Sequence, residues 1–211
     1  MRRLLLVLAM ASTSVMAEEA YLGLGSAGLT LGIGKTLLPG SMGRIEVNGL
    51  DVSHRYSSGG INYDAKLRHG SAAAFYDWFP AAEGFRMTAG LFAGDTRLTG
   101  SSTGVAGTTY TINGVGYSAA GESLSLRVKW PTLLPYLGVG WGRGQPVGGL
   151  GFFADAGVAY GRPGVSLSAS PGLTARATQA NIDAERQRIE DDLGRYRYLP
   201  VLRVGLNYSF Q

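Results

Sequence analysis

The two histidines of this 211-residue chain each lie close to a serine, a pairing that could support nucleophilic hydrolysis. His54 follows Ser53 directly, and His69 stands two residues before Ser71. A lipid-acting hydrolase would have to use one of these pairs. Their neighbours are polar, which is more typical of solvated loop histidines. We therefore predict no catalytic residues and keep the hydrolase as the least favoured hypothesis.

Two glycine motifs resemble phosphate-binding loops. Residues 23–28 fit G-x-G-x-x-G, but a strand-like pattern follows, where a dinucleotide site needs a helix. Gly34-Lys35-Thr36 resembles the end of a P-loop, but Leu29 occupies the position of its first glycine. We therefore predict no cofactor. With no cysteine and only two scattered histidines, we predict no metal site either.

Charged residues recur on one face of segments that alternate between apolar and polar positions. The set consists of three basic and three acidic residues: Arg44, Glu46, Asp77, Arg86, Asp155 and Arg203. If that face lines a narrow interior, the side chains should pair with one another, because an unpaired buried charge is costly. Two hypotheses stay open: an ion-pair plug that fills the interior, or a polar path for a small charged solute.

The elements that would position these charges are strands with a period of two. The last segment shows the pattern best, since one face holds Leu202, Val204, Leu206, Tyr208 and Phe210. Similar segments lie near 20–25, 29–37, 42–54, 62–80, 85–98, 134–142, 150–168 and 197–210. Short alternating segments separated by turn residues are typical of transmembrane barrels. The sequence therefore predicts an all-β fold, an eight-stranded antiparallel transmembrane β-barrel.

Small and aromatic residues fit the same prediction. A narrow interior needs small side chains, and we expect glycines 23, 25, 32, 34, 138, 140 and 142 to face it. Aromatic residues gather near the predicted turns, as in the girdle of a membrane barrel. They are Tyr76, Trp78, Phe79, Trp141, Tyr208 and Phe210.

Two long loops have structural signals of their own. In loop 99–133, Asn113-Gly114 predicts a tight turn and a β-hairpin near 108–120. Loop 171–196 has apolar residues at helical spacing before Gly194, which predicts a short amphipathic helix. If both termini face the periplasm, the short links 38–41, 80–84 and 143–149 are periplasmic turns and the long loops face outward.

The N-terminus predicts export. Arg2-Arg3 precede a mostly apolar stretch that ends near Ala17, which indicates a signal peptide of residues 1–17 and a mature barrel of residues 18–211. Hydrophobic residues make up 45% of the chain and charged ones only 16%, which is little charge for a soluble domain. Without Arg2 and Arg3, 17 basic residues face 15 acidic ones, so we predict no nucleic-acid partner.

Several segments together resemble a known family. They are Tyr-Leu-Gly-Leu-Gly from Tyr21, Tyr-Asp-Ala-Lys-Leu from Tyr63, Tyr-Thr-Ile-Asn-Gly-Val from Tyr110, Pro-Tyr-Leu-Gly-Val-Gly-Trp-Gly from Pro135 and Gly-Leu-Asn-Tyr-Ser-Phe from Gly205. The chain is similar in these segments to the proteobacterial ornithine-uptake (CarO-type) porins of the outer membrane. The resemblance implies a Gram-negative outer-membrane location. It also implies passage of a basic amino acid, and recognition of a terminal aromatic residue by the barrel-assembly machinery, although Gln211 follows Phe210 here.

Three functions follow as hypotheses. The first is a narrow porin-like channel for a small solute, in which the acids among the six inner charges would serve a cation. The second is a plugged barrel whose loops act in adhesion or envelope integrity, and the third is the hydrolase. The expected partners are outer-membrane lipid, periplasmic chaperones and the barrel-assembly machinery, which would read Tyr208 and Phe210.

Overall fold

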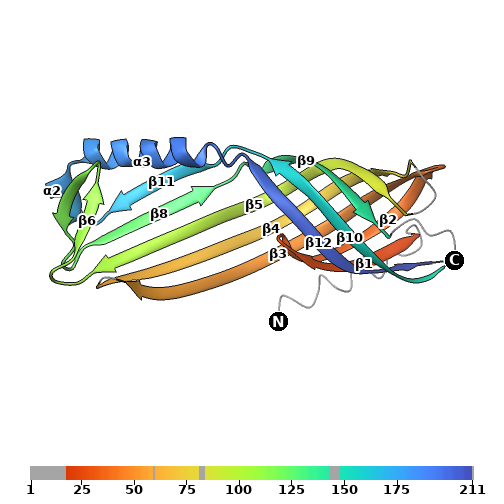
Figure 1. Cartoon of the computed structure of the whole chain (residues 1–211), viewed down its shortest axis with the longest axis horizontal. Helices are drawn as coiled ribbons and strands as arrows, with labels where there is room; N and C mark the ends of the chain where they lie inside the picture. The colour runs from red at the N-terminus through yellow and green to blue at the C-terminus, as the bar shows by residue number, and fades with distance from the viewer. Residues whose placement is uncertain (1–17, 59, 81–83, 143–147, 211) are drawn as a thin grey trace.

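The computed structural model describes residues 18–58, 60–80, 84–142 and 148–210. The predicted signal peptide and Gln211 lie outside these residues, as do parts of the turns predicted at 80–84 and 143–149. The described chain is mostly strand, with two helices gathered at one end (Figure 1). No helix within these ranges has the length and apolar character needed to cross a bilayer.

The strands and helices follow one another in a simple order. The strands are β1 (Glu19–Gly25), β2 (Gly28–Leu38), β3 (Ser41–Ser58), β4 (Ile61–Trp78), β5 (Arg86–Gly104), β6 (Thr109–Ile112), β7 (Val115–Ser118), β8 (Ser123–Lys129), β9 (Leu133–Trp141), β10 (Gly149–Tyr160), β11 (Gly164–Ala169) and β12 (Tyr198–Ser209). The helices α2 (Pro171–Ala177) and α3 (Gln179–Leu193) lie between β11 and β12.

Ten of these strands form one sheet, and neighbouring strands run antiparallel. The order is β11-β8-β5-β4-β3-β2-β1-β12-β10-β9, and β9 also pairs with β5. β5 therefore has β9 as a partner along its first half and β8 along its second half. The hairpin of β6 and β7 turns at Asn113-Gly114, both with positive φ, as predicted.

The eight predicted segments correspond to β1–β5, β9, β10 and β12, but three predictions were wrong in detail. Segment 150–168 is two strands, because the chain leaves β10 at Gly161-Arg162-Pro163 and β11 pairs with β8 instead. Proline has no N–H to continue the ladder. Loop 99–133 is not a plain loop, because β5 continues to Gly104 and β8 returns beside it. The single predicted helix is two helices, which meet at Thr178.

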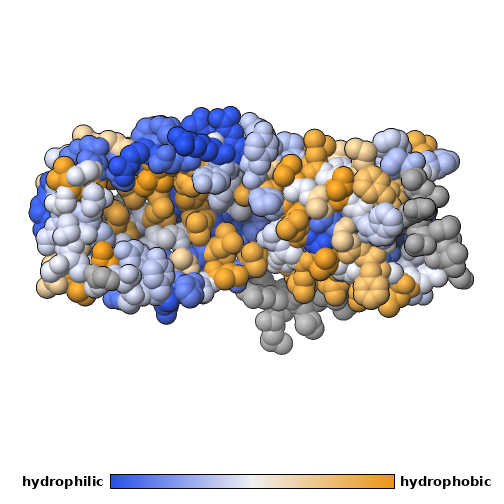
Figure 2. Space-filling view, in the orientation of Figure 1, coloured by the Kyte–Doolittle hydropathy of each residue, from blue (hydrophilic) through white to orange (hydrophobic). Residues whose placement is uncertain are grey.

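Side chains alternate between a buried face of the sheet, here called inward, and an exposed face, here called outward. The outward face is apolar: Phe152 is 76% exposed and Val204 62%. The inward face includes charged residues, and Arg203 beside Val204 is only 2% exposed. Figure 2 shows hydrophobic surface around β9, β10 and β12. This arrangement is the reverse of a water-soluble sheet and suits a lipid surrounding.

Aromatic residues mark two levels on the outward face. Tyr208 and Trp141 lie near one end of their strands, and Tyr198 lies near the other, where it packs against Tyr160 with ring centroids 5.5 Å apart. From Tyr198 to Tyr208 the chain advances ten residues, about 25 Å along a barrel axis at typical strand tilt. That height matches the apolar band of a membrane barrel. The aromatic girdle at the first end was predicted from the sequence, whereas the one at Tyr160 and Tyr198 was not.

The two ends of the sheet differ. The end near Pro39-Gly40, here called the turn end, holds both described chain ends, and Phe210 N donates to Glu18 O at 2.8 Å. The other end, here called the cap end, carries β6, β7, α2 and α3. An apolar core joins these cap elements to the sheet. It consists of Ile61, Tyr110, Ile112, Ala119, Leu167, Leu173, Ala177 and Ile182.

Glu122 fixes α2 to this cap. Ser170 Oγ donates to its carboxylate, as do Leu173 N at 3.1 Å and Arg176 Nη2 at 2.8 Å. The Ser170 hydroxyl first, and then Arg176 and the Leu173 amide, hold the pKa of Glu122 below its usual range. The hairpin is fixed to α3 in the same way, because Asn113 N donates to Glu185 Oε2 at 2.9 Å. The cap is therefore a structured unit.

The outward apolar face gives a direct test of lipid contact. Val204 on β12 and Val115 on the cap hairpin are both exposed, but only Val204 lies in the apolar band. We expect Val204→Arg to lower the free energy of unfolding from lipid bilayers by about 2–4 kcal/mol, and Val115→Arg to change it by less than about 0.5 kcal/mol. Equal effects of the two substitutions would contradict the lipid-facing assignment.

Candidate functional site: a ring of buried charges

All six charges predicted for the interior lie together on the inward face. Arg44 and Glu46 come from β3, Asp77 from β4 and Arg86 from β5, and β10 and β12 add Asp155 and Arg203. Each of the six is at most 5% exposed. Strand alternation explains the placement, because each residue occupies an inward position between outward apolar neighbours.

The six charges form a closed circuit of alternating sign, here called the charge ring. In order the members are Arg44, Asp77, Arg86, Asp155, Arg203 and Glu46, and Glu46 returns to Arg44. Three links are hydrogen-bonded ion pairs: Arg44 with Asp77, Arg86 with Asp155, and Arg203 with Glu46. The other three are longer ion pairs of 3.5 to 3.7 Å. Every member thus contacts two opposite charges, and the ring as a whole is neutral.

The Arg44–Asp77 pair is the best defined link. Arg44 Nε lies 2.5 Å from Asp77 Oδ2, and Arg44 Nη2 lies 3.0 Å from Asp77 Oδ1. Thr88 Oγ1 donates to the same carboxylate at 2.6 Å. Tyr21 links the next pair, because its hydroxyl donates to Glu46 Oε2 at 2.9 Å and accepts from Arg44 Nη1 at 3.3 Å. A bidentate guanidinium pair with these extra bonds is a strong buried contact.

Glycine makes room for the ring, as predicted. A Cβ atom at Gly140 would stand 2.4 Å from Asp155 Oδ1 and 2.7 Å from Arg86 Cζ, so any side chain there would displace this ion pair. At Gly32 a Cβ atom would stand 2.3 Å from the Tyr21 ring. Gly142 differs from the prediction, because it lies just beyond β9 with φ of +95° and its nearest neighbour is the Phe152 carbonyl.

An apolar layer lies directly on the cap side of the ring. Phe75, Phe92 and Tyr136 pack edge to face with centroids 5.2 to 5.6 Å apart, joined by Ala73, Leu134, Ala159 and Val201. The two layers are connected, since the guanidinium carbons of Arg44 and Arg203 lie 5.0 and 5.4 Å from the Phe75 ring centroid. We call this set the aromatic layer.

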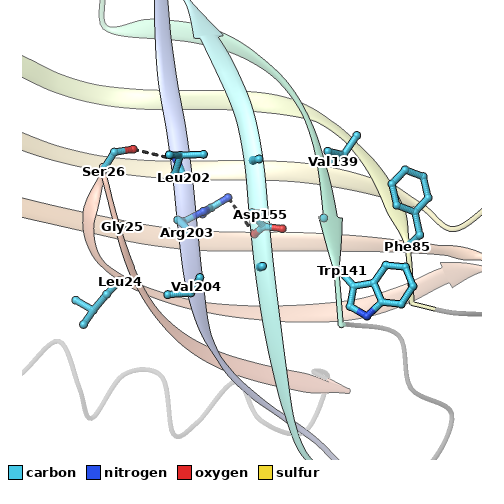
Figure 3. A pocket seen from close by; sticks show the side chains of 13 residues that line it. Leu24, Gly25, Ser26, Phe85, Val139, Trp141, Asp155, Leu202, Arg203 and Val204 are labelled. Carbon is cyan, nitrogen blue, oxygen red and sulfur yellow. Dashed lines mark hydrogen bonds and ion pairs between the residues drawn. The ribbon is translucent and has the colours of Figure 1, made fainter.

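Figure 3 shows one link of the ring, between Arg203 and Asp155, beside a groove in the outward surface. Arg203 of β12 and Asp155 of β10 point toward each other at the floor of a groove of about 590 Å³. Leu24, Val204, Val139 and Trp141 line the groove, and its strands carry small residues such as Gly140 and Ala154. The charged floor is covered by the strands themselves, because Arg203 and Asp155 are 2% and 5% exposed.

The two histidines have different surroundings. His54 is exposed and stacks on Tyr56. His69 is half-buried, and its Nε2 lies 2.9 Å from Ser71 Oγ, while its Nδ1 lies 2.7 Å from Thr96 Oγ1. Asn48 links Ser71 to Glu46, so this chain of hydrogen bonds ends on the charge ring. The orienting partner of His69 is a neutral hydroxyl, whereas a catalytic triad has a carboxylate or amide there.

Other sequence motifs fall in plain strands. Residues 23–28 cover the end of β1, the turn Ser26-Ala27 and the start of β2, and Gly34-Lys35-Thr36 lies within β2, so neither motif meets a helix N-terminus. One G-x-S-x-G match, at residues 100–104, lies inside β5, and not at the strand-to-helix turn that a nucleophile elbow requires. Tyr208 and Phe210 are exposed, with ring centroids 5.4 Å apart.

Comparison with solved structures identifies the architecture. The crystal structure of CarO from Acinetobacter baumannii matches with a TM-score of 0.65 at 21% identity, covering 93% of this chain and 99% of that one. The fold is that of CarO. The crystal structure of CarO2 from the same organism matches with a TM-score of 0.67 at 21% identity, covering 92% of this chain and 99% of that one. The predicted resemblance to CarO-type outer-membrane proteins is thus confirmed at the level of the fold.

More distant comparisons add little. A major outer membrane protein from Thermus thermophilus matches with a TM-score of 0.43 at 16% identity, covering 91% of this chain and 98% of that one. No protein-family model matches the sequence, and no curated protein matches it.

The ring members were predicted from the sequence, but the residues that connect them were not. Tyr21, Asn48, Thr88 and Phe75 all occupy inward positions of the same alternation. That periodicity was the available signal, because it marks every inward residue whatever its charge. The pairing order could not be read from it, since it depends on strand register.

Removal of one ring member should be far more damaging than removal of a surface charge. Asp155→Asn leaves Arg86 and Arg203 each with one partner fewer, and we expect a loss of about 3–5 kcal/mol in the free energy of unfolding. Asp95→Asn, which breaks exposed pairs with Arg97 and Lys129, should cost less than about 1 kcal/mol. Urea titration in bilayers measures both. Similar costs would mean that the ring is not a buried electrostatic unit.

Proposed function

We propose that this chain is an outer-membrane protein of a Gram-negative bacterium, folded as a closed eight-stranded barrel whose interior is plugged and whose cap faces the outside. The observation that carries the proposal is the charge ring. The proposed function of the protein is structural: the barrel anchors the folded cap at the cell surface and contributes to the integrity of the envelope.

The strand pairings support a closed barrel. They lead from β5 through β4, β3, β2, β1, β12, β10 and β9, and β9 pairs again with β5. A closed barrel leaves no unpaired backbone groups in lipid, which is the condition for strands to cross a bilayer. The outward apolar band between the two aromatic levels has the matching height. Outer-membrane lipid is therefore the expected surrounding of these eight strands.

The charge ring supports a plug more than a channel. A channel for a small cationic solute would need an acid free to bind it, but Glu46, Asp77 and Asp155 each contact two arginines. The aromatic layer then fills the next level of an interior that eight strands make barely wide enough for side chains. Beyond the aromatic layer lies a small cavity of about 130 Å³, and Phe92 and Leu134 of that layer are among the residues that line it.

Two expectations from the sequence belong to the same proposal. Tyr208 and Phe210 at the end of β12 would be read by the barrel-assembly machinery after chaperones deliver the chain to the membrane. The second expectation is that the protein has no enzymatic activity, and the hydrogen-bond chain from His69 through Ser71 and Asn48 to Glu46 would give these residues a structural role. Lipid hydrolysis that disappears in His69→Ala, but not in His54→Ala, would contradict this last point.

The plug is tested by single-channel recording in planar bilayers. We expect the refolded chain of residues 18–211 to insert without discrete openings, and to keep the altered gel mobility of a folded barrel until it is heated. Discrete cation-selective openings whose selectivity falls in Asp155→Asn would contradict the plug and support the narrow channel for a basic solute. Asp95→Asn, which changes an exposed acid of the cap end, is the matched control.

A further inference from the structure

Basic residues stand side by side on the outward face where the apolar band ends at the cap end. Arg68 of β4 lies directly opposite Arg97 of β5, and Arg97 lies directly opposite Lys129 of β8. One step further toward the cap, Lys66 and Arg127 flank Thr99 in the same way. These five cations, Lys66, Arg68, Arg97, Arg127 and Lys129, are here called the basic belt.

The belt is only partly neutralised. Asp51 pairs with Lys66 at 3.3 Å and with Arg68 at 3.0 Å, and Asp95 pairs with Arg97 at 3.0 Å and with Lys129 at 3.7 Å. Two acids therefore serve five cations. Arg127 is exposed and has no ion pair among the described residues. Three further exposed arginines, Arg162, Arg195 and Arg197, lie at the cap ends of β10 and β12, and Arg162 pairs with Asp191 at 3.7 Å.

The height of the belt relative to lipid follows from strand register. On β4 the outward positions pass from Trp78 at the turn end through Tyr76, alanines and Gly70 to Arg68. Ten residues separate Trp78 from Arg68, as they separate Met87 from Arg97 on the neighbouring strand. At typical strand tilt this is again about 25 Å. The belt thus begins where the hydrocarbon ends, at the level of the lipid headgroups.

The arrangement has a cost that a ligand would relieve. Like charges directly opposite each other on neighbouring strands destabilise a sheet. Among the described strand residues, the turn end carries one outward cation, Lys35 of β2, and Glu18 interacts with it electrostatically. An anion held at the cap-end level would turn the repulsion into attraction, and guanidinium groups suit phosphate because they can donate two parallel hydrogen bonds.

We propose that the basic belt binds the phosphate groups of phosphorylated glycolipid in the outer leaflet of the membrane. The proposal rests on the proposed function for the orientation of the barrel. Arg68, Arg97 and Lys129 would contact phosphate at the edge of the hydrocarbon, and Lys66 and Arg127 would contact it one level higher. Asp51 and Asp95 would hold the side chains extended along the surface.

The probe is bisphosphorylated lipid A, titrated against the detergent-solubilised barrel and followed by native mass spectrometry. Lipid A from which both phosphates have been removed is the reference. We expect the barrel to bind the bisphosphorylated form at least about tenfold more tightly. Arg127→Gln combined with Lys129→Gln should weaken that binding by about fivefold for each cation removed and leave binding of the reference unchanged.

The control is Arg186→Gln combined with Arg188→Gln, which removes two cations of α3 that pair within the helix. It should bind both lipids as the unmodified barrel does. Equal affinity for the two lipids, or an unchanged affinity in the belt variant, would overturn the proposal. If the chain fails to fold into bilayers, the proposed function fails, whereas a folded barrel that ignores phosphate refutes the belt alone.

Discussion

The structure depends on the compensation of buried charge. Three arginines and three acids lie inside an apolar shell, where a single unpaired charge would cost several kcal/mol. The alternating ring meets this demand because every member contacts two opposite charges. The ring also joins the consecutive strands β3, β4 and β5 to β10 and β12, which lie much later in the sequence. Its geometry therefore fixes strand register as well as filling the interior, and Gly140 is small because Asp155 and Arg86 occupy the space beside it.

The rest of the molecule divides at the level where the apolar band ends. Below that level the outward face is apolar, and the inward face holds the charge ring and the aromatic layer, so the surrounding medium is lipid. Above it, β3, β4 and β5 continue and are joined by β8 and β11, and the apolar residues turn inward to build the core under α2 and α3. The basic belt lies at the transition. The same three strands thus serve a membrane barrel in one half and a water-exposed cap in the other.

Much of the strand arrangement and of the charge ring could be predicted from the period-two pattern of the sequence. It assigned all six ring members to one face, because Arg203 lies between Leu202 and Val204 and Asp155 between Ala154 and Ala156. It could not give the ring its order, since Arg86 meets Asp155 only through the pairing of β9 with both β5 and β10. It also failed at residues 150–168, where apolar alternation continues although the strand changes partners at Pro163. The alternating pattern indicates which face of the sheet a residue occupies. The choice of the neighbouring strand depends on contacts between residues that are remote in sequence.

The most direct test of the ring is a double-substitution experiment on two neighbouring members. Asp155→Asn alone leaves a net positive ring, and Arg86→Met alone leaves a net negative one. The two together leave Asp77, Arg44, Glu46 and Arg203 as a neutral, fully paired chain. The free energy of unfolding in bilayers should therefore be higher for the double variant than for Asp155→Asn, although the double variant has lost more contacts. If the two losses simply add, the six residues do not act as one charge-compensated unit and the account is wrong.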